Sequence, residues 1–331
     1  MILICFGTRP EYIKIKPLLK AFDGKIPYKL LFTGQHKDLL SHVEGDIRRL
    51  EIKDGKNRLD SIVSSIMNND NVFEGVSSVL VQGDTTSVFS LALAAFHRKL
   101  KVIHLEAGLR TYDLNNPYPE ELNRQMVSRI ADIHLCPTQE AYDNLIREKT
   151  PGSKFVVGNT VLDNLVDKAV SYEDKIIVTM HRRENHHNME EWFKKIDALA
   201  QENFNLEFIL PIHPNPNVKK HEHLLKHVKV VPPMNYDEFI DELASCRFII
   251  TDSGGIQEES SFLRKKCVVC RKTTERVEGM GTFSTLVMKP EDLFDAFKWA
   301  NKSYIPDESE PCPYGDGKSA EKILDILKNE V

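Results

Sequence analysis

The sequence predicts an α/β protein built from two doubly wound parallel sheets. Two observations carry this prediction: short β-branched apolar runs alternate with longer amphipathic stretches, and the whole series occurs twice. At roughly 100–200 residues per domain, a chain of 331 residues also fits about two domains. We therefore expect two Rossmann-like domains, each with helices on both faces of its sheet.

Six apolar runs occupy the first half of the chain. Each ends at a Gly, a Pro or a polar residue, as expected for strands buried on both faces. Their sequences are MILICFG, KLLFTG, SVLVQGD, KVIHLEAG, DIHLCPT and KFVVGN. Helical patterns such as SVFSLALAAFHRK and ELNRQMVSRIA lie between them. This half predicts an N-terminal domain over residues 1–167.

The second half repeats the alternation with KIIVTMH, LEFILPIH, VKVVPP, RFIITDSGG and KCVVCR, separated by helical patterns such as MEEWFKKIDALAQE and YDEFIDELASC. It predicts a C-terminal domain over residues 168–315, entered through a hinge in NLVDKAVSYEDK, where the apolar pattern lapses. The last stretch, KSAEKILDILKNE, is amphipathic. We expect it to form a helix over about residues 316–331 that packs back on the first domain.

Charge and composition exclude several classes of protein. Lys and Arg total 44 against 49 Asp and Glu, and the net charge of −5 argues against a nucleic acid as the main partner. No apolar stretch approaches the roughly 20 residues that span a bilayer, and the N-terminus is more typical of a buried strand than of a secretory signal. Among six scattered cysteines, the close pair Cys267 and Cys270 fits two thiols on opposite faces of a buried strand. We therefore expect a reducing, cytoplasmic location.

Polar motifs follow the predicted strands, and ligands of open parallel sheets bind outside the carboxyl ends of the strands. This placement predicts an active site in the cleft between the two domains. In the motif TDSGGIQEES, Ser253, Gly254 and Gly255 either bind an anion through free backbone N–H groups or form an ordinary N-cap turn. Glu258 or Glu259, in the first turns of the following helix, could accept hydrogen bonds from ribose hydroxyls.

A second motif, GTRPEYIKIKP, follows the first strand. Pro10 fits the first helical position, and Arg9 at the turn carries a planar, permanently charged group that could hold a phosphate. From the residues alone we interpret Lys14 and Lys16 as part of a solvated helix face. The spacing of the glycine differs from that of a Walker loop.

Carboxylates gather in the middle blocks VQGDTTS, HLEAGLRTYD and NPYPEELNRQ. Asp84 and Glu106 end neighbouring strands, and Glu120 and Glu121 stand just before a helix that carries Arg124. Crowding and burial push the pKa values of such carboxylates apart, which favours acid–base catalysis. Helix capping and surface ion pairing could explain Glu121, but they fit Glu106 poorly because apolar residues flank it at a buried strand end.

Several histidines also stand where they could act in a site. His181 in HRRENHHN follows a strand and is a candidate proton shuttle or phosphate donor, with two arginines after it. His213 in PIHPNP ends another strand. His223 and His227 lie four residues apart on an expected helix, a spacing open to metal binding. Without a further ligand nearby, we interpret that pair as a solvated face and expect no metal site.

The joint order of these motifs resembles one family closely, the non-hydrolysing UDP-N-acetylglucosamine 2-epimerases. The resemblance spans the chain from residue 1 to the last helix. It is carried by GTRPE, TGQH, QGDTTS, EAGLR, PEELNR, GNTVLD, HRREN, PIHPNP, TDSGGIQEES, TTER and PYGDG.

The resemblance implies a GT-B-like fold and the reversible conversion of UDP-N-acetylglucosamine to UDP-N-acetylmannosamine. UDP would be eliminated and added back through a 2-acetamidoglucal, with no metal or nicotinamide cofactor. It also implies a UDP-sugar as the partner and allows a homodimer. Carried over by position, the catalytic residues would be Asp84, Glu106, Glu120 and His181. The substrate-binding residues would be Arg9, Lys14, Arg124, His213, Ser253, Gly254, Gly255, Glu259 and Arg276, with Glu259 at the ribose.

Three departures from the family pattern bear on function. After TGQH the chain lacks the longer acidic and Gln-rich segment near the site where UDP-N-acetylglucosamine activates the bacterial enzymes. Although Gln35, Arg182 and His213 remain, we predict weak or absent activation of this kind. VEGMGTFSTLV after TTER lacks the usual Pro, which could change the uridine contact, and EYIKIKPLL departs from the common first helix. This second difference leaves a modified UDP-diacetamido sugar open as the substrate.

Other readings of the motifs remain. A hydrolysing 2-epimerase would release N-acetylmannosamine and UDP, but GTRPE and the complete carboxylate set argue against it. A glycosyltransferase on the same fold would need an acceptor. A catalytically dead nucleotide-sugar sensor would be expected to lack the carboxylates, yet Asp84, Glu106 and Glu120 are present.

Overall fold

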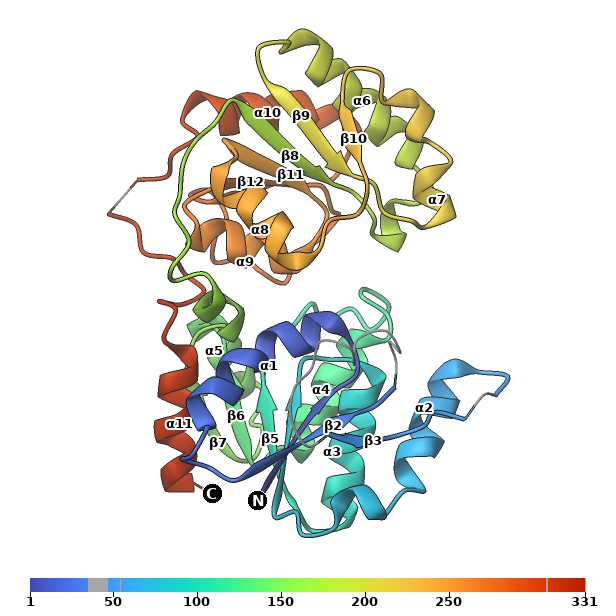
Figure 1. Ribbon diagram of the computed structural model, residues 1–331, viewed down its shortest axis with the longest axis vertical. Helices are drawn as coiled ribbons and strands as arrows, with labels where there is room; N and C mark the ends of the chain where they lie inside the picture. The colour runs from blue at the N-terminus through green and yellow to red at the C-terminus, as the bar shows by residue number, and fades with distance from the viewer. Residues whose placement is uncertain (35–46, 54, 308, 331) are drawn as a thin grey trace. The chain divides into compact units, whose positions relative to one another are not determined.

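The computed structural model describes residues 1–34, 47–53, 55–307 and 309–330. The chain forms two compact units (Figure 1). Unit 1 comprises Met1–Asn164 and Gly315–Val331, and unit 2 comprises Leu165–Tyr314. Each unit holds one parallel sheet, so the expected pair of doubly wound α/β domains is confirmed.

The sheet of unit 1 has the strand order β3-β2-β1-β4-β5-β6-β7, and every pair is parallel. Its strands are β1 (Ile2–Phe6), β2 (Tyr28–Phe32), β3 (Ile47–Arg49), β4 (Ser78–Gln82), β5 (Lys101–Leu105), β6 (Ile133–Cys136) and β7 (Ser153–Val156). The order reverses at β1, which lies between β2 and β4. The carboxyl ends of β1 and β4 therefore form the switch point where ligands of such sheets bind.

Helices cover both faces of this sheet. They are α1 (Arg9–Phe22), α2 (Arg58–Met67), α3 (Thr86–His97), α4 (Glu120–Ile130), α5 (Gln139–Arg147) and α11 (Ser319–Glu330), with 3-10 turns at Asn71–Phe73 and Thr160–Asn164. One core packs α1 and α11 on the sheet through residues such as Leu18 and Ile323. The other packs α2, α3 and α4 through residues such as Ile62, Leu91 and Val127.

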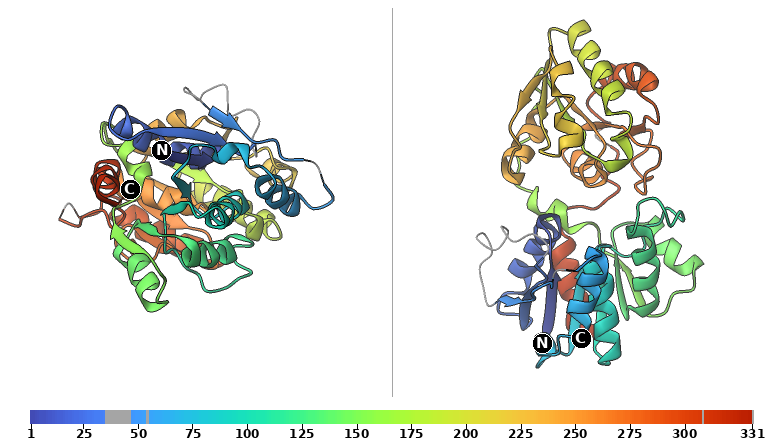
Figure 2. Two further views of the ribbon diagram at one scale, coloured as in Figure 1. Left: turned by 90° about the horizontal axis from the view of Figure 1, so that it is seen from below. Right: turned by 90° about the vertical axis from the view of Figure 1, so that its right-hand side faces the viewer.

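The last helix belongs to unit 1 although it follows unit 2 in the chain. It contacts α1, and both chain termini lie at the same end of unit 1 (Figures 1 and 2). The Asp163 carboxylate, at the 3-10 turn before unit 2, accepts hydrogen bonds from the backbone N–H groups of Ser319 and Ala320 at 3.1 and 2.7 Å. The same carboxylate thus caps the start of α11.

Unit 2 has the strand order β10-β9-β8-β11-β12-β13, again all parallel. Its strands are β8 (Lys175–Thr179), β9 (Glu207–Pro211), β10 (Lys229–Val231), β11 (Phe248–Thr251), β12 (Lys266–Val269) and β13 (Ser284–Leu286). Its helices are α6 (Met189–Glu202), α7 (Pro216–Lys219), α8 (Tyr236–Ser245), α9 (Gly254–Phe262) and α10 (Leu293–Lys302), with 3-10 turns at Arg183–Asn185, Glu222–Leu224 and Pro290–Asp292. The switch point of this sheet lies at the carboxyl ends of β8 and β11.

The core of unit 2 is rich in large apolar side chains. Trp192 and Phe193 on α6 and Phe297 on α10 pack on one face of the sheet against Phe208 and Phe248. Strand residues of the opposite parity, such as Ile177, are also fully buried. Burial on both faces explains why these strands read as continuous apolar runs in the sequence.

The expected helix with His223 and His227 on it is wrong. Only Glu222–Leu224 forms a single 3-10 turn there. The His227 backbone N–H donates to the Asp197 carboxylate at 2.6 Å, and the His227 ring pairs with the same carboxylate at 2.9 Å. Because this N–H donates to Asp197, it cannot form the backbone hydrogen bond of a helix, and the segment is not helical at His227.

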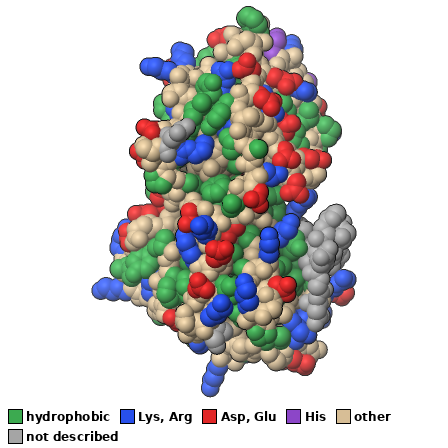
Figure 3. Space-filling view, turned by 60° about the vertical axis from the view of Figure 1, so that its left-hand side comes forward, with side chains coloured by type: hydrophobic (Ala, Val, Ile, Leu, Met, Phe, Trp, Pro, Cys, Tyr) green, Lys and Arg blue, Asp and Glu red, His purple; other side chains and the backbone are tan. Residues whose placement is uncertain are grey.

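The remaining compositional expectations concern thiols, metals and membranes. All six cysteines carry free thiols. Cys267 and Cys270 are fully buried, and burial raises the pKa of Cys267 to about 12, so the protonated thiol is favoured. Among the described residues, no cluster of three His, Cys, Asp or Glu side chains could hold a metal ion, and no helix has the length and apolar character to span a membrane. On the face shown in Figure 3, acidic and basic side chains intermingle.

Candidate active site

The switch point of unit 1 brings GTRPE after β1 next to QGDTT after β4. Thr8 caps α1, and Glu11 completes a capping box with it. The Glu11 carboxylate accepts the Gly7 and Thr8 N–H groups at 2.6 and 2.8 Å and the Thr85 hydroxyl at 2.9 Å. Its burial raises the Glu11 pKa. One buried carboxylate thus ties the turn that carries Arg9, which is exposed, to the turn that carries Asp84.

Glu106 stands one residue beyond β5 in a left-handed conformation, with a φ of 64°. This conformation is uncommon for residues other than glycine and marks a position that the surrounding structure holds in place. The Lys14 ammonium lies 2.6 Å from both carboxylate oxygens, and the Gln82 amide donates to one of them. The Asn159 amide lies 3.5 Å from the other oxygen.

The residue pattern predicted that Lys14 lies on a solvated helix face, and this prediction is wrong. Its side chain is 15% exposed and that of Glu106 only 7%. Lys16, two residues further along α1, is exposed as expected. The two lysines separate because residues two apart on a helix point in different directions.

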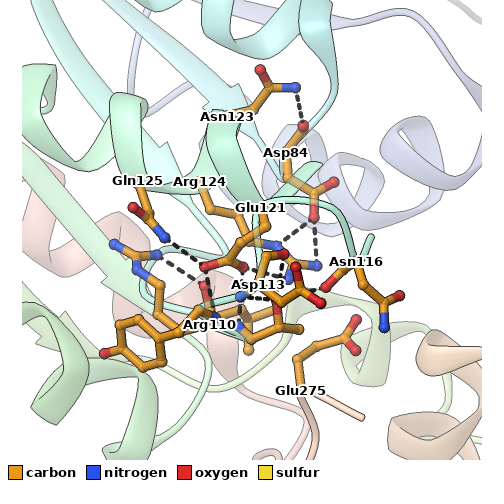
Figure 4. Close-up of polar contacts among 12 residues, drawn as sticks. Asp84, Arg110, Asp113, Asn116, Glu121, Asn123, Arg124, Gln125 and Glu275 are labelled. Carbon is orange, nitrogen blue, oxygen red and sulfur yellow. Dashed lines mark hydrogen bonds and ion pairs between the residues drawn. The ribbon is translucent and has the colours of Figure 1, made fainter. Parts of the chain in front are cut away.

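The Asp84 carboxylate is held by Arg124 from α4 (Figure 4). Arg124 Nε and Nη2 both lie 2.8 Å from Asp84 Oδ2, and the Asn123 amide donates to the Asp84 carbonyl oxygen at 2.8 Å. The Asp84 side chain remains 27% exposed, so it is accessible while it is paired. Glu120, half-buried, begins the same helix.

Glu121 is fully buried, so the interpretation of this residue as a surface ion pair is wrong. Its carboxylate accepts the backbone N–H groups of Thr111 and Tyr112 at 3.0 and 3.1 Å and the Gln125 amide at 2.9 Å. Arg124 Nη1 lies 3.3 Å from it (Figure 4). Glu121 thus fixes both the loop after β5 and the arginine that holds Asp84.

The turn between β4 and Asp84 is anchored to β5 from two sides. Gly83 has a φ of 82°, a conformation that glycine adopts without strain. Its N–H donates to the Leu105 carbonyl at 3.0 Å, and its carbonyl lies 2.8 Å from Nε2 of His104. Burial lowers the His104 pKa to about 4, so the ring is neutral near pH 7. Since a carbonyl oxygen only accepts, Nε2 must carry the proton.

The switch point of unit 2 is organised by Asp252, which follows β11 and is fully buried. Its Oδ2 accepts the backbone N–H groups of His181 at 2.9 Å and Arg182 at 2.8 Å, and the Asn185 amide at 3.1 Å. These donors all follow β8. Asp252 therefore joins the end of β8 to the turn that opens α9.

The two histidines predicted for the site lie together in unit 2. The rings of His181 and His213 stack at 5.3 Å between centroids and 15° between planes. Burial lowers the pKa of both rings. His213 Nδ1 accepts the Asn215 N–H at 3.1 Å, so the proton of its neutral ring is on Nε2.

The turn Ser253, Gly254 and Gly255 stands at the N-terminus of α9, where Ser253 occupies the N-cap position without a side-chain capping bond. A Cβ atom on Gly254 would lie 2.9 Å from Nη1 of Arg276, so a larger residue would disturb that guanidinium. The buried Arg276 pairs with Glu258 at 2.9 Å and with Glu275. Backbone N–H groups at such a turn suit an anion.

Glu259 is buried on the same helix. Its carboxylate accepts a hydrogen bond from the Tyr236 hydroxyl at 2.9 Å. Burial and the neighbouring Glu259 carboxylate raise the Tyr236 pKa, so the phenol stays protonated and keeps donating.

The structure thus gathers the predicted residues at one switch point in each unit. Those near the strand ends of unit 1 are Arg9, Lys14, Asp84, Glu106, Glu120 and Arg124. Those of unit 2 are His181, His213, Ser253, Gly254, Gly255, Glu259 and Arg276. Gln35, which bears on the predicted loss of activation, lies outside the described residues.

Sequence reasoning missed several residues that hold the predicted side chains in place, which are Glu11, Gln82, His104, Asn185, Tyr236 and Asp252. Glu11 and Asp252 stood inside quoted motifs, and a carboxylate next to a predicted buried strand end was the available signal. Tyr236 and Asn185 gave no comparable signal.

Comparison with known proteins places this geometry in a family. Residues 20–328 match the sequence profile of a family described as UDP-N-acetylglucosamine 2-epimerase. A UDP-N-acetylglucosamine 2-epimerase of Salmonella borreze is 36% identical over 370 aligned positions, which cover 98% of this chain and 97% of that protein. The crystal structure of UDP-GlcNAc 2-epimerase from Neisseria meningitidis bound to UDP-GlcNAc has a TM-score of 0.87 and 32% identity, with 99% of both chains covered.

A more distant protein has a similar fold. The crystal structure of Acinetobacter baumannii MurG matches with a TM-score of 0.59 and 13% identity over 99% of both chains. This likeness concerns the fold alone and confirms the GT-B-like architecture. Full-length identity above 30% and the family profile establish more than the fold. The chain belongs to the UDP-N-acetylglucosamine 2-epimerase family.

Proposed function

We propose that the protein interconverts UDP-N-acetylglucosamine and UDP-N-acetylmannosamine without releasing the free sugar. The observation that carries this proposal is Glu106, a carboxylate held by Lys14 and Gln82 at a strained strand end beside the Asp84–Arg124 pair. Strained, charge-paired carboxylates at a switch point are typical of acid–base sites. Family membership supplies the substrate class.

The reaction inverts C2 through an elimination. A carboxylate base takes the C2 proton, the electron pair of that C–H bond forms the C1–C2 double bond, and the C1–O bond to the diphosphate breaks. The products are 2-acetamidoglucal and UDP. Re-addition of UDP to C1, with a proton delivered to the other face of C2, gives the epimer.

Two faces of one carbon require two proton-transfer groups. Asp84, Glu106 and Glu120 supply more than one carboxylate for this task. The paired cations Lys14 and Arg124 stabilise whichever carboxylate is ionised. A positioned carboxylate is required because the C2 proton is only weakly acidic.

The departing UDP needs positive charge and hydrogen-bond donors. The N-terminal turn of α9 offers backbone N–H groups to the diphosphate, and Arg9 and His181 would add to them. His213 would contribute beside His181. Glu259, oriented by Tyr236, would accept hydrogen bonds from the ribose hydroxyls.

Proton NMR of the purified protein with UDP-N-acetylglucosamine in D2O tests the proposal. We expect signals of UDP-N-acetylmannosamine to appear and the C2 proton signal of both nucleotide sugars to be lost to deuterium. Free N-acetylmannosamine with UDP would establish the hydrolysing alternative instead. Unchanged substrate would overturn the proposal for this sugar, and a parallel incubation with a UDP-diacetamido sugar would test the modified substrate.

Cleavage of the C1–O bond can be tested separately. Substrate carrying oxygen-18 between C1 and the diphosphate should scramble the label into the non-bridging positions, which phosphorus NMR detects. Deuterium at C2 without scrambling would contradict elimination. The Glu106→Gln variant is the control, because it should retain the fold and show neither exchange.

A further inference from the structure

Asp252 is a carboxylate with no exposed surface, and it follows β11 at the switch point of unit 2. Oδ2 is occupied by the backbone N–H groups of His181 and Arg182 and by the Asn185 amide. Oδ1 lies 3.1 Å from the His181 N–H. A buried carboxylate is stabilised by several such donors, and here all of these donors follow β8 rather than its own strand.

The ring of His181 lies beside the same carboxylate. Its Nδ1 is 3.5 Å from Asp252 Oδ1, within ion-pair distance, while 31% of the His181 side chain is exposed. Asp252 thus faces one ring nitrogen from the buried side. The exposed part of the ring remains able to meet a ligand.

The other titratable groups around the His181 ring are basic and do not favour a positive charge on it. His213 stacks on it, His186 donates from Nε2 to the His181 carbonyl at 3.1 Å, and the Arg182 guanidinium is exposed. These three groups disfavour a charged ring, as burial does, and only Asp252 favours it. Asp252 thus counteracts the effect of partial burial and of these three basic neighbours on the His181 ring.

We propose that Asp252 is a positioning residue that fixes the tautomer and orientation of His181, so that Nδ1–H faces Asp252 and Nε2 is presented to the diphosphate of the substrate. The distance between Nδ1 and Oδ1, the complete burial of Asp252 and its bonds to the backbone of His181 carry this assignment. It rests on the proposed function for the identity of the ligand.

The consequence for the reaction follows from the charge that develops on the leaving group. When the C1–O bond breaks, the diphosphate gains negative charge, and a His181 ring protonated on both nitrogens would stabilise that charge by donating its Nε2–H. Asp252 stabilises the doubly protonated ring. In the second half-reaction, the His181 ring would release the diphosphate as a diphosphate oxygen attacks C1.

The tautomer can be measured in the wild-type protein. Nitrogen-15 NMR of protein labelled in histidine, with His181→Gln used to assign the signal, reads both ring nitrogens as pH is varied. We expect the neutral His181 ring to carry its proton on Nδ1, since the group bonded to one nitrogen sets the tautomer. A neutral ring protonated on Nε2 would overturn the proposal. This measurement needs neither substrate nor activity.

A double-mutant cycle separates positioning from a purely structural role. Asp252→Asn places an amide beside Nδ1 and should favour the Nε2–H tautomer. We expect it to lower kcat at least about tenfold, with a smaller change in KM, and to shift the alkaline limb of the kcat profile to lower pH, because the protonated ring loses its charge partner. In the His181→Gln background the same substitution should have little further effect.

The matched control is the pair His227 and Asp197, which lies outside the proposed site in the same unit and has an Nδ1–Oδ2 distance of 2.9 Å. Asp197→Asn should leave kcat, KM and the pH profile unchanged. If Asp252→Asn lowers kcat equally in both backgrounds, Asp252 supports only the fold and the proposal is wrong. If the wild-type protein leaves UDP-N-acetylglucosamine unchanged, the proposed function fails, while the tautomer of His181 still decides the role of Asp252.

Discussion

The ammonium of Lys14 lies 2.6 Å from both carboxylate oxygens of Glu106, although 92 residues separate them in the chain. One comes from the first turns of α1 and the other from the end of β5. Both side chains are largely buried, so water screens the pair poorly. This charge-compensated pair at a strand end is consistent with the acid–base role that we propose for Glu106.

Replacing Lys14 by Met should remove the charge partner of Glu106 while preserving the length of the side chain. We expect kcat to fall by at least about tenfold, which corresponds to about 1.4 kcal/mol of lost transition-state stabilisation. Lys16→Met is the matched control, because Lys16 is exposed on the same helix and should be silent. NMR measures the rate of epimerisation of both variants. Equal rates would show that Lys14 does not contribute to turnover.

Glu106→Gln tests the carboxylate itself. The amide keeps the shape of the side chain but cannot take a proton from C2, so turnover should be nearly abolished. UDP binding should persist, because the residues proposed to hold UDP are others. Calorimetry with UDP and deuterium exchange at C2 measure the two properties separately, and near-wild-type exchange would exclude Glu106 as a base.

The sequence allowed the strand ends to be predicted because buried parallel strands read as short apolar runs, and the polar residues after them must meet at one edge. This reasoning located Asp84, Glu106 and His181. It misjudged Lys14, since the alternating IKIK pattern resembles an exposed face and its partner is distant in sequence. The strands Ile47–Arg49 and Ser284–Leu286 give no apolar signal, because two of the three residues in each are polar or charged.

Buried carboxylates formed the largest gap in the sequence-based prediction. Glu121 and Asp252 are fully buried, yet charged residues are expected at the surface unless specific donors surround them. Those donors are backbone N–H groups of distant segments, such as Thr111 for Glu121 and His181 for Asp252. No local pattern reveals them, because every residue except proline carries the same N–H group.

Arg9→Ala tests the proposed contact with the diphosphate. Arg9 is exposed at the start of α1, so its loss should leave the fold intact. We expect UDP to bind about tenfold or more weakly, the scale of a hydrogen bond to a charged group. Titration calorimetry with UDP measures the change, and an affinity equal to that of Lys16→Met would refute the role.

Tyr236→Phe tests whether Tyr236 orients Glu259 for the ribose. The variant loses only the hydroxyl that donates to Glu259 at 2.9 Å. We expect KM for the nucleotide sugar to rise about fivefold, the scale of one hydrogen bond, with kcat nearly unchanged. Discrimination between UDP and 2′-deoxy-UDP should also weaken, because a carboxylate free to rotate holds the ribose less well.

The control for this variant is Tyr172→Phe. Tyr172 donates to the Arg264 carbonyl at 2.9 Å in the same unit, so the same atom is lost from a hydrogen bond that involves none of the proposed ligand-binding residues. Its KM and its preference for UDP over 2′-deoxy-UDP should match those of the wild type. An equal shift in both tyrosine variants would show that a general loss of stability, and not the position of Glu259, changes KM.

The last prediction concerns the pH dependence of stability. His104 and His134 lie opposite each other on β5 and β6, and burial lowers their pKa values to about 4 and about 3. In the unfolded chain both rings have the ordinary histidine pKa of about 6.5. Between pH 6.5 and the lowered pKa, the unfolded state therefore holds more protons, so stability is fully present above pH 6.5 and is lost as the pH falls.

For His104 the difference of 6.5 − 4 amounts to about 3 kcal/mol at roughly 1.4 kcal/mol per pKa unit. Urea unfolding followed by circular dichroism from pH 7 to pH 4 should therefore show a shallower loss of stability in His104→Gln than in the wild type. His134→Gln should also be less sensitive to acid.

Only His104→Gln should slow epimerisation, because His104 holds the Gly83 carbonyl next to Asp84, whereas His134 bonds to the Pro151 carbonyl. Equal activity of the two variants would show that the Gly83 turn keeps its shape without His104.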